Sequence, residues 1–95
     1  MHKIWVADDD SAIRVVLEES FSSSGFDVKT FSSGDDVVTE LKLEAPDLIL
    51  TDVQMPGMLG YDLLKHINDN YENIPVIIMT ALTNHSQASQ AFEHL

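Results

Sequence analysis

Ninety-five residues, 44% of them hydrophobic and 22% charged, are enough for one folded domain with a small core and too few for two. Sixteen acidic against five basic residues give a formal charge of −11, which argues against direct binding to nucleic acid or to an anionic membrane. The chain has no cysteine, and its apolar start is too short for a signal peptide or a membrane span, so we expect a cytoplasmic protein.

Short apolar runs alternate with amphipathic stretches, which is typical of an α/β fold with a parallel sheet between helices. The first run predicts a strand at Lys3 to Ala7. A stripe with helical spacing follows, and Gly25 is placed to end that helix. The stripe consists of Ile13, Val16, Leu17, Ser20 and Phe21.

The second strand, predicted at residues 26–31, has polar neighbours around Val28, which favours an edge position in the sheet. Ser33 and Asp36 have the spacing of an N-terminal capping motif, so we expect the second helix to begin near Ser33. Pro46 marks its end. The apolar side of this helix consists of Val37, Val38 and Leu41.

Residues 47–52 are nearly continuously aliphatic, which predicts a central strand covered on both faces. After a loop at 53–60, a third helix should bury one apolar side, and Pro75 should open a fourth strand at 76–80. A fourth helix is predicted near the end of the chain. The apolar sides of these last two helices consist of Leu63, Leu64 and Ile67, and of Ala88, Ala91, Phe92 and Leu95.

Polar side chains stand where three of the predicted strands end. Asp8, Asp9 and Asp10 follow the first strand, Asp52 closes the third, and Thr80 closes the fourth. Because the carboxyl ends of parallel strands face one crevice, these side chains should converge. Two charges ~4 Å apart near a surface repel by roughly 4 kcal/mol. A hard cation would offset this repulsion, so the pattern indicates a Mg²⁺-assisted phosphate site.

These residues also have ordinary structural interpretations. Asp before a helix is commonly an N-cap, a role that we expect for Asp10 or Ser11. Asp52 could be a turn residue and Thr80 an ordinary end of a strand. The position of Asp52 after a buried strand favours a nucleophile that forms an aspartyl phosphate, with the Thr80 hydroxyl donating to a phosphoryl oxygen. The four histidines lack metal-ligand spacing.

Three segments together resemble the receiver domains of bacterial two-component response regulators, which have a flavodoxin-like doubly wound fold. They are Val6-Ala7-Asp8-Asp9-Asp10-Ser11, the run from Leu48 through Asp52 to Met55-Pro56-Gly57, and Val76-Ile77-Ile78-Met79-Thr80-Ala81. The match extends over nearly the whole chain, residues 1–95. Trp5-Val6 and Met55-Pro56-Gly57-Met58 are most similar to the nitrogen-regulator subclass, whose receiver controls an ATPase that activates transcription.

The resemblance implies that a histidine kinase phosphorylates Asp52 and that the phosphorylated receiver switches an output domain or partner. It implies that Asp9 binds Mg²⁺ directly and Asp8 through water, with Asp52 and the backbone carbonyl of Gln54 completing the site. Thr80 would be the switch hydroxyl. Any enzyme activity would be at most self-phosphorylation and autodephosphorylation.

The chain departs from the family pattern after the fourth strand. Family members carry a Lys-Pro pair at the end of a fifth strand, whereas no lysine follows Lys65 here. We therefore expect an incomplete receiver with strand order 2-1-3-4 and slower phosphoryl transfer. The fourth strand would be an edge presenting Val76, Ile77 and Ile78, which favours self-association.

Two alternatives remain open at this stage. The chain could be a docking or dimerisation module that works without phosphorylation, in which case Asp52→Asn would leave partner binding unchanged. It could also be an aspartate-nucleophile phosphohydrolase. That class uses Asp-x-Asp after its first strand, so Asp8 would be the nucleophile and the chain would turn over phosphate esters steadily.

Overall fold

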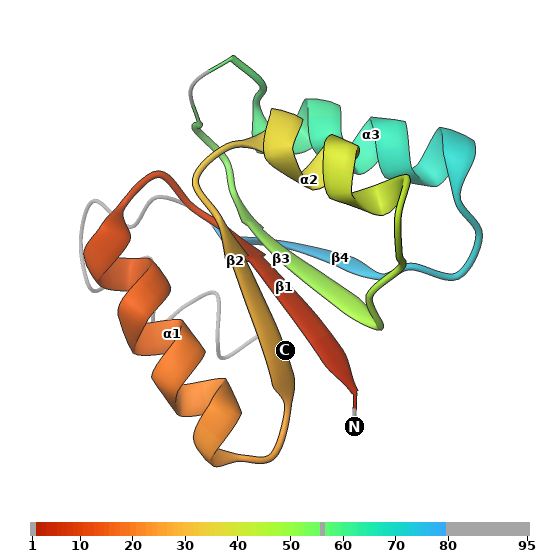
Figure 1. The fold of residues 1–95 in the computed structure, drawn as a ribbon. Coiled ribbons are helices and arrows are strands. Elements are labelled where there is room, and N and C mark those ends of the chain that lie inside the picture. Colours follow the sequence, from red (N-terminus) through yellow and green to blue (C-terminus); the bar gives the residue numbers. More distant parts are fainter. Residues whose placement is uncertain (1, 56, 80–95) are drawn as a thin grey trace, which may run out of the picture.

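The computed structural model describes residues 2–55 and 57–79 of the chain. Within these residues the chain forms a four-stranded sheet and three helices (Figure 1). In chain order the elements are β1 (Lys3–Ala7), α1 (Ser11–Ser23), β2 (Asp27–Phe31), α2 (Gly34–Leu41), β3 (Leu48–Asp52), α3 (Gly60–Asn70) and β4 (Val76–Met79).

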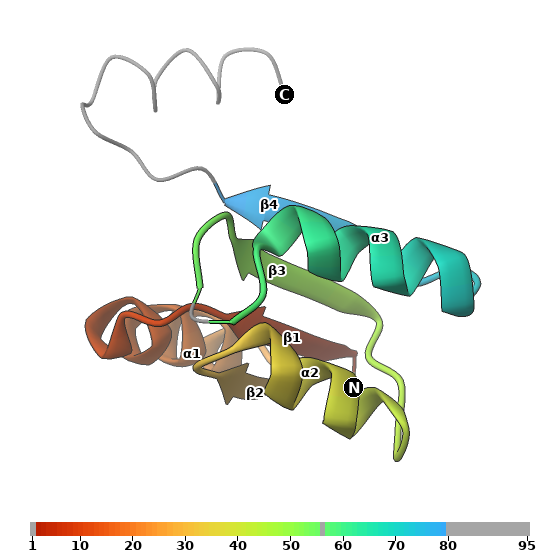
Figure 2. The ribbon, with the colours of Figure 1, turned by 90° about the horizontal axis from the view of Figure 1, so that it is seen from above.

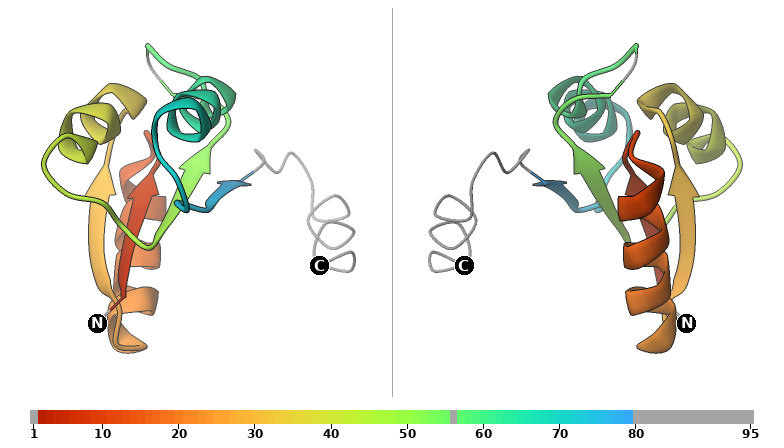
Figure 3. Two further views of the ribbon diagram at one scale, coloured as in Figure 1. Left: turned by 90° about the vertical axis from the view of Figure 1, so that its right-hand side faces the viewer. Right: turned by 90° about the vertical axis from the view of Figure 1, so that its left-hand side faces the viewer.

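The strands are arranged in the order β2-β1-β3-β4, as the sequence predicts, and each neighbouring pair is parallel. Helix α1 covers one face of the sheet, while α2 and α3 cover the other (Figures 1 and 3). Seen from above, all four strands point the same way (Figure 2). Their carboxyl ends therefore meet at one edge, where an open α/β sheet places its ligands.

Alternate residues of the two inner strands, β1 and β3, point to opposite faces and build two cores. Trp5 and Ile49 belong to the larger core, which lies beneath α2 and α3. Val6 and Leu50 belong to the smaller core beneath α1. The helices contribute Val37, Leu41, Leu63 and Ile67 to the larger core, and Leu17 and Phe21 pack against the smaller one. Both faces of the inner strands are buried, which confirms the central position predicted for β3.

Hydrogen bonds at the helix ends account for where the helices begin and stop. The Asp10 carboxylate accepts from the Ala12 N–H at 2.9 Å and caps α1, and the Ser33 hydroxyl accepts from the Asp36 N–H at 3.2 Å and caps α2. After α1, Gly25 has φ of +92°, a left-handed conformation that glycine adopts without strain. The predicted start of α2 near Ser33 and the position of Gly25 after α1 are confirmed. The predicted end of α2 at Pro46 is wrong, because α2 ends at Leu41, where the Leu43 N–H bonds the Glu40 carbonyl at 2.9 Å in a tightened last turn.

β1 has its predicted bounds, whereas β2 and β3 each begin one residue later than predicted. β2 begins at Asp27 because the Phe26 N–H bonds back to the Phe21 carbonyl at 3.1 Å and so belongs to the end of α1. β3 begins at Leu48, although the Asp47 N–H already bonds to the Lys3 carbonyl at 2.8 Å. The predicted fourth helix and Thr80 lie outside the described residues.

The apolar stripe predicted on α1 is only partly covered by the described residues. Leu17 and Phe21 are half-buried against the sheet, whereas Ile13 and Val16 are 41% and 60% exposed. No residue of α1 is fully buried within the part of the chain that the structure describes. Helix α1 is therefore held less tightly by these residues than α2 or α3.

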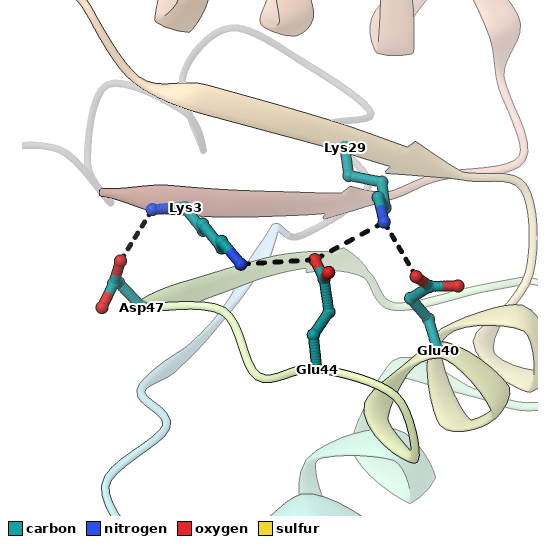
Figure 4. Close-up of polar contacts among 5 residues, drawn as sticks. All are labelled: Lys3, Lys29, Glu40, Glu44 and Asp47. Atoms are coloured by element: carbon teal, nitrogen blue, oxygen red, sulfur yellow. Dashed lines mark hydrogen bonds and ion pairs between the residues drawn. The ribbon is translucent and has the colours of Figure 1, made fainter. Parts of the chain in front are cut away.

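Charged side chains join β1 and β2 to α2 and the segment after it (Figure 4). Lys29 Nζ donates to Glu40 Oε1 at 2.8 Å, and Glu44 Oε1 lies 3.5 Å from Lys29 Nζ and 3.8 Å from Lys3 Nζ. At the start of β1, the Lys3 backbone N–H donates to the Asp47 carboxylate at 2.7 Å. Solvent screens such exposed pairs, so this cluster stabilises the fold only modestly.

None of the three described helices combines the length and apolarity needed to cross a membrane.

Candidate functional site

The carboxylates of Asp8, Asp9 and Asp52 meet at the carboxyl edge of the sheet. Asp8 and Asp9 follow β1 directly, and Asp52 is the last residue of the neighbouring strand β3. One oxygen from each of the three carboxylates lies within 4.8 Å of the others. The structure thus brings Asp52 next to Asp8 and Asp9, although more than forty positions separate it from them in the sequence.

Local hydrogen bonds shape the acidic turn after β1. The Asp8 N–H donates to the Phe31 carbonyl of β2 at 3.0 Å, and one Asp8 carboxylate oxygen accepts from the Asp10 N–H at 2.8 Å. The guanidinium of Arg14 donates to the Asp8 carbonyl at 2.6 Å. These hydrogen bonds hold Asp8 in place. Asp8 is only 3% exposed, whereas Asp9 is exposed.

Asp52 is half-buried at the opposite side of the cluster. Its Oδ1 accepts from the Val53 backbone N–H at 2.7 Å. The chain leaves the sheet after Asp52, and the Gly60 N–H at the start of α3 donates to the Val53 carbonyl at 2.8 Å. These contacts anchor the residue between the end of a central strand and the beginning of a helix.

Burial and like charge make the ionised form of Asp8 costly. Burial raises the pKa of the Asp8 carboxyl, and the neighbouring carboxylates of Asp52, Asp9 and Asp10 raise it further. The hydrogen bond from the Asp10 N–H acts in the opposite direction and lowers this pKa. Placing these carboxylates close together therefore costs electrostatic free energy.

This donor set fits a small hard cation. Mg²⁺ is bound by one or two carboxylates and keeps several positions for waters and phosphate oxygens. Asp8 has one oxygen that accepts no hydrogen bond from the described residues, Asp9 is exposed, and Asp52 is half-buried. Carboxylates are thus available from both strands, with an open side for further ligands. Asp8, Asp9 and Asp52 are the residues that would hold the ion.

Asp8→Asn is expected to stabilise the metal-free chain at neutral pH. The raised pKa means that the folded chain holds the Asp8 proton more tightly than the unfolded chain does. The protonated carboxyl therefore stabilises the folded chain. This contribution is complete below the pKa that the group has in the unfolded chain, and it is lost as the pH rises through the pKa that it has in the folded chain. We expect the free energy of unfolding in EDTA at pH 7 to rise by about 1 kcal/mol.

Urea unfolding at several pH values tests this expectation. The advantage of Asp8→Asn should shrink as the pH falls through the raised pKa of the folded wild-type carboxyl, because that carboxyl then takes up its proton. Asp36→Asn, which removes an exposed carboxyl in α2, is the control and should not gain stability at pH 7. A loss of stability in Asp8→Asn at pH 7 would contradict the electrostatic interpretation.

The structure does not test the roles predicted for Gln54 and Thr80. Gln54 is exposed in the loop after β3, so a role for its backbone carbonyl stays a prediction. Thr80 lies outside the described residues. Within residues 2–55 and 57–79, the three acids form the only group of three or more side chains suited to hold a metal, and His2 and His66 take no part in it.

Sequence reasoning missed three residues that contact the backbone of the acidic residues at the site. Arg14 bonds the Asp8 carbonyl, Thr51 bonds the Asp52 carbonyl at 3.1 Å, and Gly60 packs directly on the Asp52 backbone. A glycine at the start of a helix and a polar residue inside an aliphatic strand are the signals that could have drawn attention to Gly60 and Thr51.

Comparison with known proteins relates the chain to a group of signalling proteins. The sequence profile described as "Response regulator receiver domain" matches residues 4–94. The "DNA-binding transcriptional regulator NtrC" of Klebsiella pneumoniae is 44% identical over 89 residues, which make up 94% of this chain and 19% of that protein. The chain therefore spans about a fifth of the length of this relative.

Two solved structures of receivers have a similar fold. The solution structure of the beryllofluoride-activated NtrC receiver domain has a TM-score of 0.73 and 41% identity, covering 97% of this chain and 74% of that one. The crystal structure of the response regulator TrrA from Thermotoga maritima, in complex with Mg(2+)-BeF, has a TM-score of 0.82 and 25% identity. It covers 97% of this chain and 80% of that one.

Proposed function

Because this chain belongs to the response regulator receiver family, we propose that Asp52 accepts a phosphoryl group from a histidine kinase. The observation that carries this proposal is the Asp52 carboxylate at the end of a rigid central strand, within 4.8 Å of Asp8 and Asp9. Family membership confirms the resemblance noted in the sequence, including its likeness to the nitrogen-regulator subclass. A carboxylate held on a strand is well positioned for attack on phosphorus.

In the proposed reaction, an Asp52 oxygen attacks phosphorus and forms the oxygen–phosphorus bond of an acyl phosphate. The bond from phosphorus to the donor, a histidine nitrogen or the oxygen of acetyl phosphate, breaks. A bound Mg²⁺ would offset the charge that the acids and the phosphoryl oxygens bring together. Asp8, Asp9 and Asp52 would hold the ion with the carbonyl of Gln54, and Thr80 would donate to the phosphoryl group.

Acetyl phosphate with Mg²⁺, followed by intact-mass measurement, tests the proposed function. The chain should gain the mass of one phosphoryl group, and the gain should be lost in EDTA and reversed at alkaline pH, where acyl phosphates hydrolyse. A chain that never gains this mass, although it is folded, would overturn the proposal. The phosphohydrolase alternative has less support, because Asp8, its required nucleophile, is only 3% exposed.

The wider role of the receiver is also a proposal. The relative from Klebsiella pneumoniae is a transcriptional regulator by its name, which supports control of transcription through an output domain or partner. We place this signalling in the cytoplasm, in keeping with a chain that has no cysteine. The receiver itself would not contact DNA, because its charge of −11 opposes that contact.

Self-association through β4 is a second proposal, and it could operate without phosphorylation. Among the described strands, β4 pairs only with β3, and Ile77 on it is 52% exposed. A second copy offers a matching strand edge. We expect light scattering at high concentration to detect dimers of this chain, and Ile77→Lys to reduce them at least several-fold. A monomeric wild-type chain at all concentrations would rule this interface out.

A further inference from the structure

Thr51 is a buried polar residue to which the proposed reaction assigns no part. It is 0% exposed and stands in β3 between Leu50 and Asp52, where the neighbouring strands supply only apolar side chains opposite it, Ala7 and Ile78. A hydroxyl in such surroundings costs free energy unless it forms a hydrogen bond. Valine would fill the same space without that cost, so the hydroxyl calls for an explanation.

The Thr51 hydroxyl donates to the backbone carbonyl of Asp52 at 3.1 Å and also lies 3.8 Å from the sulfur of Met55. That carbonyl belongs to the peptide unit that joins Asp52 to Val53. The N–H of the same unit donates to Asp52 Oδ1 at 2.7 Å. One peptide unit therefore accepts a bond from Thr51 and donates a bond to the nucleophile.

A peptide unit is planar, so its oxygen and its N–H cannot turn independently. Holding the carbonyl oxygen in place also holds the N–H, and the N–H in turn holds Oδ1. On the far side, the Gly60 N–H fixes the next carbonyl, that of Val53, at 2.8 Å. Asp52 Oδ2 accepts no hydrogen bond from the described residues and is left available for attack.

We propose that Thr51 is a positioning residue, whose hydroxyl orients the Asp52 carboxylate through the peptide unit that follows it. This inference rests on the proposed function, because it assigns Thr51 to the attack of Asp52 on phosphorus. Correct orientation of a reacting group speeds a reaction. Losing one hydrogen bond from this arrangement should slow acyl phosphate formation roughly three- to tenfold.

The experiment compares four proteins, all confirmed as folded by urea unfolding: wild type, Thr51→Val, Thr51→Ser and Thr39→Val. Initial rates of acyl phosphate formation are measured by intact mass over a range of acetyl phosphate concentrations with Mg²⁺. Thr51→Val should lower the maximal rate with little change in the half-saturating concentration, and Thr51→Ser should restore it to within about twofold. Thr39→Val removes a comparable bond, to the Asp35 carbonyl in α2 at 3.1 Å, and should react like wild type.

Hydrogen exchange of the Val53 amide, measured by nuclear magnetic resonance, gives a readout that does not depend on phosphorylation. It should speed up several-fold in Thr51→Val relative to the amides of β1, and Thr51→Ser should retain the wild-type value. If wild type gains no phosphoryl group but the exchange result holds, the proposed function fails and the orientation of Asp52 by Thr51 stands. Unchanged Val53 exchange in Thr51→Val, or a serine variant as slow as valine, would overturn the inference.

Discussion

Asp52→Asn is expected to lower the rate of phosphoryl gain by at least about a thousandfold, to the background of the intact-mass measurement. The amide nitrogen and oxygen are far weaker nucleophiles than a carboxylate oxygen, while the side chain keeps nearly the same size and still places an oxygen near the Val53 N–H. The fold should persist, because the substitution removes one of three charges that repel each other within 4.8 Å. The loss would therefore be chemical and not structural.

Asp47→Asn is the matched control, because Asp47 also flanks β3 but lies at its amino-terminal end. This variant should gain the phosphoryl mass at the wild-type rate. Peptide mapping of the wild-type product should locate the modification at Asp52. A phosphoryl gain that survives in Asp52→Asn at the wild-type rate would place the nucleophile elsewhere and exclude Asp52 as the phosphoacceptor.

The sequence predicts the sheet and the acidic cluster well because both depend on local pattern. Aliphatic runs in β1 and β3 indicate inner strands, and residues at the ends of parallel strands must converge whatever the loops between them do. The cluster of Asp8, Asp9 and Asp52 follows from those two facts alone. Capping by Asp10 and Ser33 is equally local, because each side chain bonds a backbone N–H two or three positions later.

The contacts around the cluster could not be predicted in the same way. The bond from Arg14 to the Asp8 carbonyl depends on how α1 leaves the sheet, and the packing of Gly60 on Asp52 depends on how α3 approaches it. Exposure of Ile13 and Val16 is a further case, since their helical spacing alone suggests burial. Each of these features is set by the relative placement of two elements, which periodicity does not specify.

Gly60→Ala is expected to lower the free energy of unfolding by about 3 kcal/mol and to impair phosphorylation of Asp52. A Cβ at this position would overlap the backbone carbonyl oxygen of Asp52 and stand 3.1 Å from Val53 Cα. Both obstacles are backbone atoms of the inner strand and its exit, so they cannot move aside as a side chain would. Either α3 must shift outward or the end of β3 must bend, and both changes disturb the nucleophile.

Two other glycines serve as controls for Gly60→Ala in urea unfolding and in the acetyl phosphate assay. Gly34→Ala meets only the Met58 side chain, at 3.0 to 3.1 Å, and a flexible methionine can adapt, so we expect a loss below about 1 kcal/mol. Gly25→Ala meets nothing within 4 Å but must adopt a φ of +92°, which should cost about 1 kcal/mol without affecting phosphorylation. If Gly60→Ala were as stable and as reactive as Gly34→Ala, α3 would not constrain Asp52. Position 60 requires glycine because the Asp52 backbone lies so close to it. Backbone conformation is not the reason, since the φ of Gly60 is not positive.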